Sequence, residues 1–373
     1  MKILRFTFQN YRNLEEDSIS PCEGTNLIYG KNAQGKTNLL EAMWLFTGGH
    51  SFRGAKDGEL VRFGETSCTL GLEFFSEERE QTAKLTIRGG KREAEINGIL
   101  KRSAAALVGK FCAVIFSPEH LALVKGGPAL RRSFLDGALC QSRPAYAKQF
   151  VLYQRTLQQR NTLLKDIPRH RELLGTLEIW DEKLAKYGAQ LIRQREEYLS
   201  FISEPVKEVY RGISQGKEEL EIFYQCSLRR KREGPMQDGD FYEALEASRN
   251  TDIALGYTAS GPHRDDMELK VDGISARSFG SQGQQRSIVL AMKLAEAQVL
   301  QQMTGEAPVI FLDDVMSELD TERQDYLLNH VKGRQVFLTC CDPNSIQDFR
   351  QGALFHVESG RVSASQRTVE GMP

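Results

Sequence analysis

One short segment near the N-terminus combines the residue types that hold a phosphate group. An apolar strand over residues 26–29 precedes it and a helix-competent stretch over 38–46 follows it, so backbone N–H groups and a helix N-terminus would point at phosphate oxygens. Lys36 would neutralise the β- and γ-phosphates, and the Thr37 hydroxyl would bind Mg²⁺. The segment predicts a site for ATP or GTP, with an accidental Gly-Lys turn as the alternative. Its residues are Gly30, Lys31, Asn32, Ala33, Gln34, Gly35, Lys36 and Thr37.

A second segment ends a run of apolar residues with two carboxylates. Residues 309–312 read Val-Ile-Phe-Leu, and Asp313 and Asp314 follow them. A buried parallel strand of this kind would carry its acids to the phosphates. We expect Asp313 to hold Mg²⁺ and Asp314 to orient or deprotonate the attacking water. The alternative is a strand followed by an ordinary polar turn.

A third segment, residues 279–286, opens a helix that leads into this acidic strand. A serine hydroxyl, a glycine N–H and a helix N-terminus together make an anion site, although alone they could be a helix cap. The segment resembles the signature sequence of ABC ATPases, and residues 317–320 resemble the loop that crosses the ABC dimer interface. The resemblance implies that Ser281, Gly283 and Gln284 reach the γ-phosphate held by a second copy. Two copies, head to tail, would then complete two ATP sites.

The bulk composition sets the broad class. With 373 residues the chain can form two cores, and its 40% hydrophobic and 27% charged residues are typical of a soluble globular protein. No apolar run of 18 residues or signal-peptide core is present, so we expect neither export nor a membrane span. Seven scattered cysteines without a Cys-x-x-Cys pair favour a reducing cytoplasm. A net charge of −1 neither requires nor excludes DNA binding.

The order of elements predicts an α/β protein: an ABC-type P-loop ATPase head, with a mixed sheet and an antiparallel β lobe, interrupted by an inserted α-helical arm. We assign residues 1–127 and 251–373 to the split head, and residues 128–250 to the arm. An apolar stripe over residues 173–202 predicts a helix that packs against another over 146–165, and Pro205 should kink or end it. Strands are expected over residues 3–8, 25–29, 67–75, 83–88, 111–116, 308–312 and 335–339, and a helix over 284–302.

The motifs depart from those of transporter ATPases in three places. Gln282 stands where the signature usually has Gly, Asp314 replaces the usual Glu, and Cys340-Cys341-Asp342 offers no switch histidine. A shorter carboxylate reaches less far, which predicts slow hydrolysis. Residues 6–13 resemble instead the opening of SMC-like DNA-repair ATPases, and this resemblance places Arg12 near bound nucleotide.

More specifically, the chain resembles the RecF family of bacterial DNA replication and repair proteins. The resemblance implies an ATP- and Mg²⁺-dependent homodimer without long coiled coils that binds DNA at single-strand gaps. It further implies slow, DNA-stimulated ATP hydrolysis that releases the dimer, and a role in recombinational repair, replication-fork maintenance and the SOS response. The implied protein partners are RecR and RecO, with RecA loaded downstream. The matching segments are residues 30–42, 116–121, 124–126, 131–136, 260–266, 281–286 and 312–320.

Alternatives to this function stay open on the sequence. The chain could be a nucleotide-gated binding module whose hydrolysis is incidental, or an ABC-type module that acts on a protein partner without DNA. Basic pairs are candidate DNA contacts, although each could simply be a solvated face. Neither their roles nor those of His263 and Arg264 follow from the sequence. The candidates are Lys91-Arg92, Lys101-Arg102, Arg131-Arg132 and residues 229–232.

Overall fold

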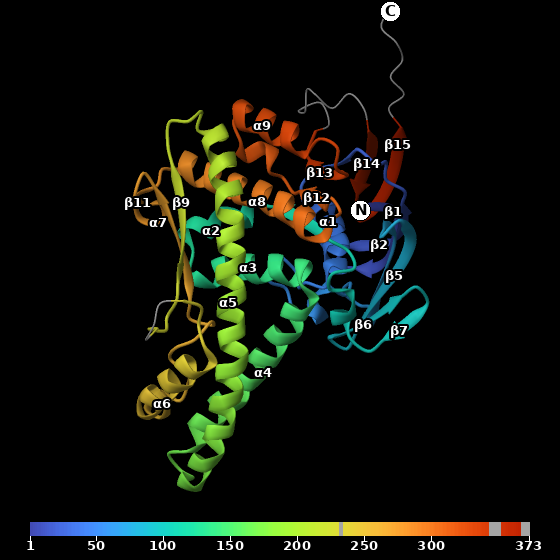
Figure 1. Cartoon of the computed structure of the whole chain (residues 1–373). Helices are drawn as coiled ribbons and strands as arrows, with labels where there is room; N and C mark the ends of the chain where they lie inside the picture. Colours follow the sequence, from blue (N-terminus) through green and yellow to red (C-terminus); the bar gives the residue numbers. More distant parts are fainter. Residues whose placement is uncertain (231–233, 343–351, 367–373) are drawn as a thin grey trace, which may run out of the picture. The chain divides into compact units, whose positions relative to one another are not determined.

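The computed structural model describes residues 1–230, 234–342 and 352–366, which form two compact units (Figure 1). The first unit contains Met1–Ala122, Glu208–Lys217 and Gln282–Pro373, and the second contains Leu123–Lys207 and Glu218–Ser281. The expected α/β head with an antiparallel lobe and a helical insert is confirmed. Where the sequence suggested a boundary at residue 250, residues 251–281 belong with the helical unit. Within the described residues, no helix has an apolar stretch long enough to cross a bilayer.

One sheet of the first unit is antiparallel throughout. Its strands alternate buried apolar and exposed polar residues, as the buried Leu70, Leu72 and Phe74 of one strand show. The last hairpin turns through Asn97 and Gly98, both at positive φ, which suits a two-residue turn. In sheet order the strands are β2 (Leu14–Ile19), β1 (Lys2–Tyr11), β4 (Ser67–Ser76), β5 (Arg79–Arg88), β6 (Lys91–Ile96) and β7 (Ile99–Lys101).

The other sheet of this unit is mainly parallel and carries the predicted phosphate loop. Its central strands are buried on both faces, and one hydrophobic core joins this sheet, the helix after the loop and the antiparallel sheet. In sheet order the strands are β15 (Arg361–Gln366), β14 (Ala353–Glu358), β3 (Thr25–Tyr29), β13 (Val336–Cys340), β12 (Val309–Leu312) and β8 (Ala113–Phe116). The helices of this unit include α1 (Lys36–Trp44), α8 (Gln282–Thr304) and α9 (Thr321–Val331).

The register of the parallel strands determines which residues meet at one edge. Tyr29 of β3 pairs with Cys340 of β13, and Leu338 of β13 pairs with Leu312 of β12. The carboxyl ends of three strands that are distant in sequence therefore lie together, which is where open α/β sheets bind ligands.

The second unit is mainly helical. Its longest helix does not end at Pro205 but continues to Ile213, and its last residues, from Glu208 on, belong to the first unit. Ile202, Val206 and Val209 are buried on either side of Pro205, and this packing offsets the missing N–H. The helices are α2 (Ala122–Lys125, at the junction), α3 (Pro128–Ser142), α4 (Pro144–Asp166), α5 (Leu174–Ile213), α6 (Asp238–Leu255) and α7 (Ala276–Phe279); the strands are β9 (Leu220–Gln225), β10 (Asp266–Val271) and β11 (Ile274–Ser275).

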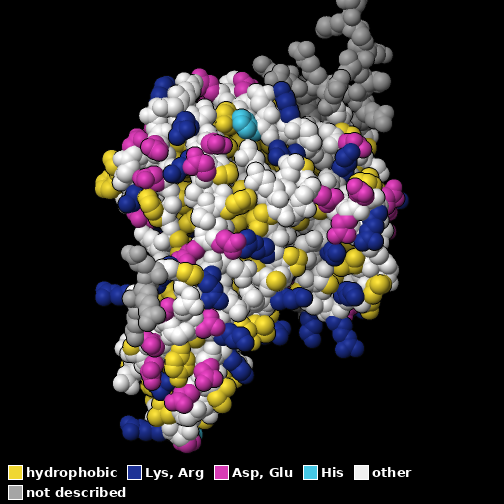
Figure 2. Space-filling view, in the orientation of Figure 1, with side chains coloured by type: hydrophobic (Ala, Val, Ile, Leu, Met, Phe, Trp, Pro, Cys, Tyr) yellow, Lys and Arg dark blue, Asp and Glu magenta, His cyan; other side chains and the backbone are white. Residues whose placement is uncertain are grey.

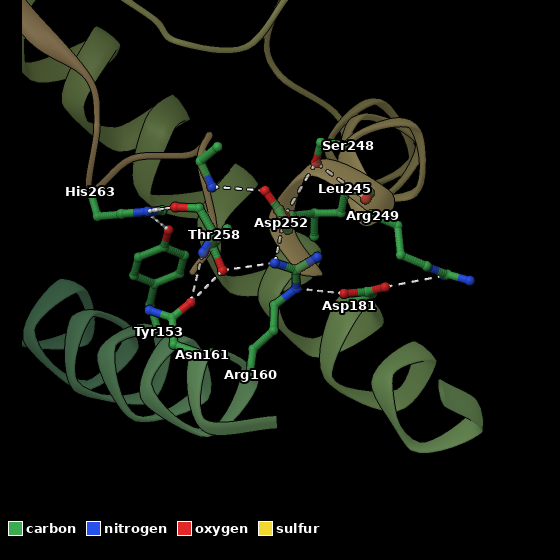
Figure 3. A network of polar contacts seen from close by, with 11 residues as sticks. Tyr153, Arg160, Asn161, Asp181, Leu245, Ser248, Arg249, Asp252, Thr258 and His263 are labelled. Atoms are coloured by element: carbon green, nitrogen blue, oxygen red, sulfur yellow. Dashed lines mark hydrogen bonds and ion pairs between the residues drawn. The ribbon is translucent and has the colours of Figure 1, made fainter. Parts of the chain in front are cut away.

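Buried ion pairs hold the helices of this unit together. Arg160 of α4 is fully buried and donates to Asp181 of α5 and Asp252 of α6, each at 2.7 Å, and to the Thr258 hydroxyl at 2.8 Å (Figure 3). Removing one member would leave an uncompensated buried charge. The network therefore fixes the relative positions of α4, α5 and α6.

The segment 260–266, whose role does not follow from the sequence, also holds elements of this unit together through polar contacts. Arg131 of α3 pairs with both oxygens of Asp266, and Arg132 donates to the backbone carbonyl of Asp265 at 2.8 Å. His263 bonds the Tyr153 hydroxyl at 2.6 Å and the Thr258 carbonyl at 3.0 Å (Figure 3). Arg131 is buried, so its first role is to join α3 to β10.

Candidate functional site

The P-loop, residues 30–37, connects β3 to α1 with a backbone that three positive-φ residues shape. Gly30, Ala33 and Gly35 have φ values of 150°, 65° and 120°. A Cβ on Gly30 would lie 2.3 Å from the Val357 carbonyl oxygen of β14, so only glycine fits there. Lys36 is 6% exposed, and its Nζ donates to the carbonyls of Gly30 and Lys31 at 2.7 and 3.1 Å. The ammonium group thus lies inside the loop that is expected to hold phosphate.

Two turns from distant parts of the chain hold the outer end of the P-loop. Asn13, in the β1–β2 turn, donates to the Gln34 carbonyl at 2.9 Å and accepts from Asn38 at 2.7 Å. In the β14–β15 turn, the Gly360 N–H donates to the same carbonyl at 3.1 Å. A Cβ on Gly360 would lie 1.9 Å from the Asn13 carbonyl oxygen, so the two turns are in direct contact. No pattern in the sequence indicated that Asn13 or Gly360 would clamp the P-loop in this way.

Asn13→Ala should weaken ATP binding by about 5–10-fold, because it removes hydrogen bonds worth about 1 kcal/mol from the folded loop. Isothermal titration calorimetry with Mg-ATP measures the change. Gln9→Ala is the matched control, since Gln9 lies on β1, which leads into this turn, and its side chain bonds only the exposed Glu16 among the described residues. An unchanged dissociation constant for Asn13→Ala would show that the loop needs no clamp.

Asp313 lies directly opposite the first turn of α1. The Thr37 and Thr339 hydroxyls both donate to its Oδ1 at 2.9 Å. The carboxylate is only 3% exposed, and burial raises its pKa to about 6 in spite of these two hydroxyls. The nearby charges of Asp314 and Glu119 raise this pKa further. A buried carboxylate beside a hydroxyl, with further acids close by, is a suitable donor set for a hard divalent cation.

Asp314 takes an uncommon backbone conformation at the end of β12. Its φ is 54°, its N–H donates to the Thr339 hydroxyl at 2.8 Å, and its carbonyl accepts from Ser317 at 2.8 Å. Aspartate tolerates the left-handed region better than most residues, and such positions occur often at active sites. The chain therefore turns sharply after Asp313, and the separate roles of the two carboxylates stay predictions.

Arg12 is anchored to a buried acid. Its Nε and Nη2 donate to the two oxygens of Glu41 at 2.5 and 2.9 Å, and the Tyr11 and Ser51 hydroxyls complete the shell of that carboxylate. Hydrogen bonding to Glu41 raises the pKa of Arg12, although burial acts against it. Its contact with nucleotide stays a prediction.

The start of α8 contacts the segment 316–320 and α9. Arg286 pairs with Glu318 at 2.9 Å, and Arg323 donates to the Ser287 hydroxyl at 2.9 Å and to the Gly283 carbonyl at 3.4 Å. Gly283 and Gln284 thus open a helix tied to the segment that resembles the ABC interface loop, while Ser281 ends the second unit.

Comparison with known proteins decides the family. The model of the RecF/RecN/SMC N terminal domain matches residues 2–363. A protein of Acetivibrio thermocellus named DNA replication and repair protein RecF is 38% identical over 97% of this chain and 100% of its own length. One of the same name from Agathobacter rectalis is 39% identical, over 97% of this chain and 99% of its own length. The chain belongs to the RecF family.

Solved structures agree with this family. The structure described as the recombination mediator protein RecF-ATP in the RecFOR pathway has a TM-score of 0.91 and 36% identity, covering 98% of both chains. An Smc head domain of Pyrococcus furiosus has a TM-score of 0.55 at 14% identity, covering 98% of this chain and 96% of that one. The second likeness shows that the RecF-family chain shares the fold of SMC heads.

The candidate DNA contacts of this RecF-family chain separate by burial. Arg92 is tied to Asp57 and to the Gly49 carbonyl, and Arg131 is buried, so neither side chain is available on the surface. Lys101 and Arg102 are exposed, and Figure 2 shows basic side chains projecting below the region of β6 and β7. Arg230 pairs with Glu196, and residues 231 and 232 lie outside the described residues.

Cys341 of the RecF-family chain lies at the P-loop, where transporter ATPases have a switch histidine nearby. Its Sγ is 3.0 Å from Asn32 Oδ1 and 4.0 Å from Lys36 Nζ. All seven cysteines lie in the described part of the chain, and Cys341 alone among them is exposed. Burial raises the pKa of Cys68, Cys112, Cys140, Cys226 and Cys340 to about 11 or 12, which makes those thiols unreactive near neutral pH.

N-Ethylmaleimide should therefore label Cys341 first, and saturating Mg-ATP should slow this labelling by about 10-fold or more, because bound ligand reduces access to a reactive thiol. Mass spectrometry of peptides after short exposure measures the rate, and Cys341→Ser is the control that loses the label. Labelling that is indifferent to ATP would place the thiol outside the nucleotide site.

Proposed function

We propose that this chain is an ATPase that binds ATP and Mg²⁺ at the P-loop, dimerises in the ATP-bound state, and binds DNA in recombinational repair. The observation that carries the proposal is the contact between Thr37 and Asp313, which come from the two ends of the chain and meet beside the buried Lys36. Membership of the RecF family supports it. Hydrolysis at this site would open the dimer and release it from DNA.

The P-loop residues would divide the work of holding the phosphates. Backbone N–H groups of residues 33–37 would donate to phosphate oxygens, and Lys36 would exchange its two loop carbonyls for the β- and γ-phosphates. Asn13 and Gly360 would keep the loop in shape while this exchange occurs. Asp314 would accept a proton from the attacking water.

Thr37 and Asp313 fit Mg²⁺, because both are oxygen donors 2.9 Å apart and the acid is poorly solvated. When bound, Mg²⁺ would neutralise negative charge on the phosphates and position the nucleotide. Thr339 would keep Asp313 oriented through its hydroxyl.

We base the proposed dimerisation on the resemblance of residues 279–286 to the ABC signature. Ser281, Gly283 and Gln284 would contact the γ-phosphate held by a second copy, and the tie between Arg286 and Glu318 would couple that contact to the interface segment. Each copy would then supply half of both sites, so turnover would depend on protein concentration.

The names of the relatives support the biological setting. The proteins of 38–39% identity are named DNA replication and repair protein RecF, and the solved structure is described as a recombination mediator in the RecFOR pathway. We extend this setting to duplex DNA with a single-strand gap, with RecO and RecR as partners and RecA loaded downstream. Slow hydrolysis that DNA stimulates would act as the timer.

Steady-state ATP turnover against protein concentration, with and without gapped duplex DNA, tests the proposal. We expect turnover per subunit to rise with concentration and to rise again with DNA. Concentration dependence without any response to DNA would favour the alternative, a nucleotide-gated module that acts on a protein partner. Turnover that ignores both variables would contradict the composite site.

A further inference from the structure

One side chain of the segment 260–266 is left pointing outward. His263 and Asp266 are used in contacts within the unit, and Asp265 accepts from the Tyr224 hydroxyl at 2.6 Å and the Ser227 N–H at 2.7 Å. Arg264 is exposed, and its guanidinium carbon lies 5.0 Å from the centre of the Tyr257 ring. In the described part of the chain no carboxylate pairs with it. The segment therefore presents one cation from a rigid frame.

The residues on either side of this pair fix its position. The Thr258 N–H and hydroxyl both donate to Asn161 of α4 at 2.8 Å, and His263 holds the Thr258 carbonyl (Figure 3). Tyr257 directly precedes Thr258, and Arg264 directly follows His263. Contact with the Tyr257 ring restricts the motion of the exposed guanidinium, which lowers the entropy cost of binding an anion.

The flank of α4 beside the pair carries no acid. Counting from Asn161, residues three and seven before it and four after it share one side of the helix, and these are Gln158, Gln154 and Lys165. A Cβ on Gly256 would lie 3.3 Å from Lys165, which places that lysine against the same loop. The only acid in α4 is its last residue, Asp166. We name Gln154, Gln158, Lys165, Tyr257 and Arg264 the arm face.

We propose that the arm face binds the sugar-phosphate backbone of DNA, with Arg264 as its principal contact. The inference rests on the proposed function, in that it requires the chain to bind DNA. Lysine, arginine, glutamine and tyrosine are the side chains that contact nucleic-acid phosphates, and a row of them without carboxylates complements a polyanion. The planar guanidinium fork binds a phosphate through two N–H groups, which a lysine does not.

Fluorescence anisotropy with a labelled gapped duplex, the full chain and Mg-ATP tests the arm face over a range of salt concentrations. Arg264→Ala should weaken binding by about 5–10-fold and lower the salt slope by about one ion. Arg264→Lys keeps the charge but loses the fork, so it should lose about 2–3-fold with little change in slope. Because Arg264 is exposed, an unchanged thermal midpoint confirms that the variants fold.

Lys183→Ala is the matched control, because Lys183 is also an arm cation stacked on an aromatic ring, 5.2 Å from the centre of Trp180. It should change DNA affinity by less than about 2-fold, the size of a general charge effect. A loss for Arg264→Ala no greater than for Lys183→Ala overturns the arm face and leaves the proposed function standing. A wild-type chain that binds no duplex overturns both.

Discussion

Asp314→Asn is expected to lower ATP turnover by about 100–1,000-fold while the protein still binds ATP. Removing a general base costs roughly this factor. Asparagine tolerates positive φ as well as aspartate does, so the φ of 54° at this position adds no strain in the variant. The Asp314 N–H donates to Thr339 and its carbonyl accepts from Ser317, and both bonds use main-chain atoms that the variant keeps. The substitution therefore isolates the carboxylate.

Turnover by phosphate release and Mg-ATP affinity by calorimetry measure the two parts of this prediction. Asp325→Asn, an exposed acid of α9, is the control for loss of charge in the same unit and should behave as the wild type. Light scattering should find the ATP-dependent dimer in Asp314→Asn and find it longer-lived than in the wild type. Turnover within 3-fold of the wild type would assign the base to another residue, and Glu119 would then be the next acid to test.

The parts of the site that lie within one motif were predictable from sequence. The P-loop sets its own backbone through its glycines, and the acidic strand end follows from one apolar run. Their meeting was also predictable, because the carboxyl ends of parallel strands share an edge of the sheet. Thr37 and Asp313 are 276 positions apart, yet both positions follow from local pattern and this one rule.

The clamps on the P-loop were not predictable, because each depends on the contact of two turns. Asn13 meets Gln34 through the pairing of β1 with β2, and Gly360 arrives from a C-terminal hairpin that no pattern indicated. A turn glycine and a turn asparagine are common in any chain. Only the fold shows that these two touch the same carbonyl.

A pair of adjacent basic residues in the sequence did not predict that both side chains are exposed. Lys91 and Arg92 lie on opposite faces of β6, so one is exposed and the other is tied to Asp57. Strand alternation would have separated them if β6 had been recognised.

Helix α6 was not predicted because few of its residues are buried. Phe241, Leu245 and Asp252 are its only buried residues, so its apolar residues show no clear helical period. The domain boundary near 250 consequently fell inside a helix.

Asp313→Asn should abolish Mg-dependent turnover, with a loss of at least about 100-fold, and yet stabilise the protein when Mg²⁺ is absent. The pKa of Asp313 is about 6 in the folded chain against an ordinary value of 3.8. The native state therefore holds a proton that the unfolded state has lost between these pH values, and metal-free stability falls as pH rises through this window. A shift of about two pKa units corresponds to about 3 kcal/mol above pH 6. Asparagine removes this buried charge and still accepts from Thr37 and Thr339.

Differential scanning fluorimetry in EDTA provides the measurement. At pH 7.5 the melting temperature of Asp313→Asn should exceed that of the wild type by about 2–6 °C, since a few kcal/mol moves a chain of this size by a few degrees. The difference should shrink as pH falls from 7.5 to 5, because the wild-type carboxyl then becomes neutral too, while all other groups titrate equally in both proteins. With added Mg-ATP the wild type should have the higher melting temperature, because binding stabilises the protein that retains the Asp313 ligand for Mg²⁺. A variant that is less stable than the wild type at every pH would contradict this prediction. It would mean that the Asp313 carboxylate stabilises the folded chain even when no metal is bound.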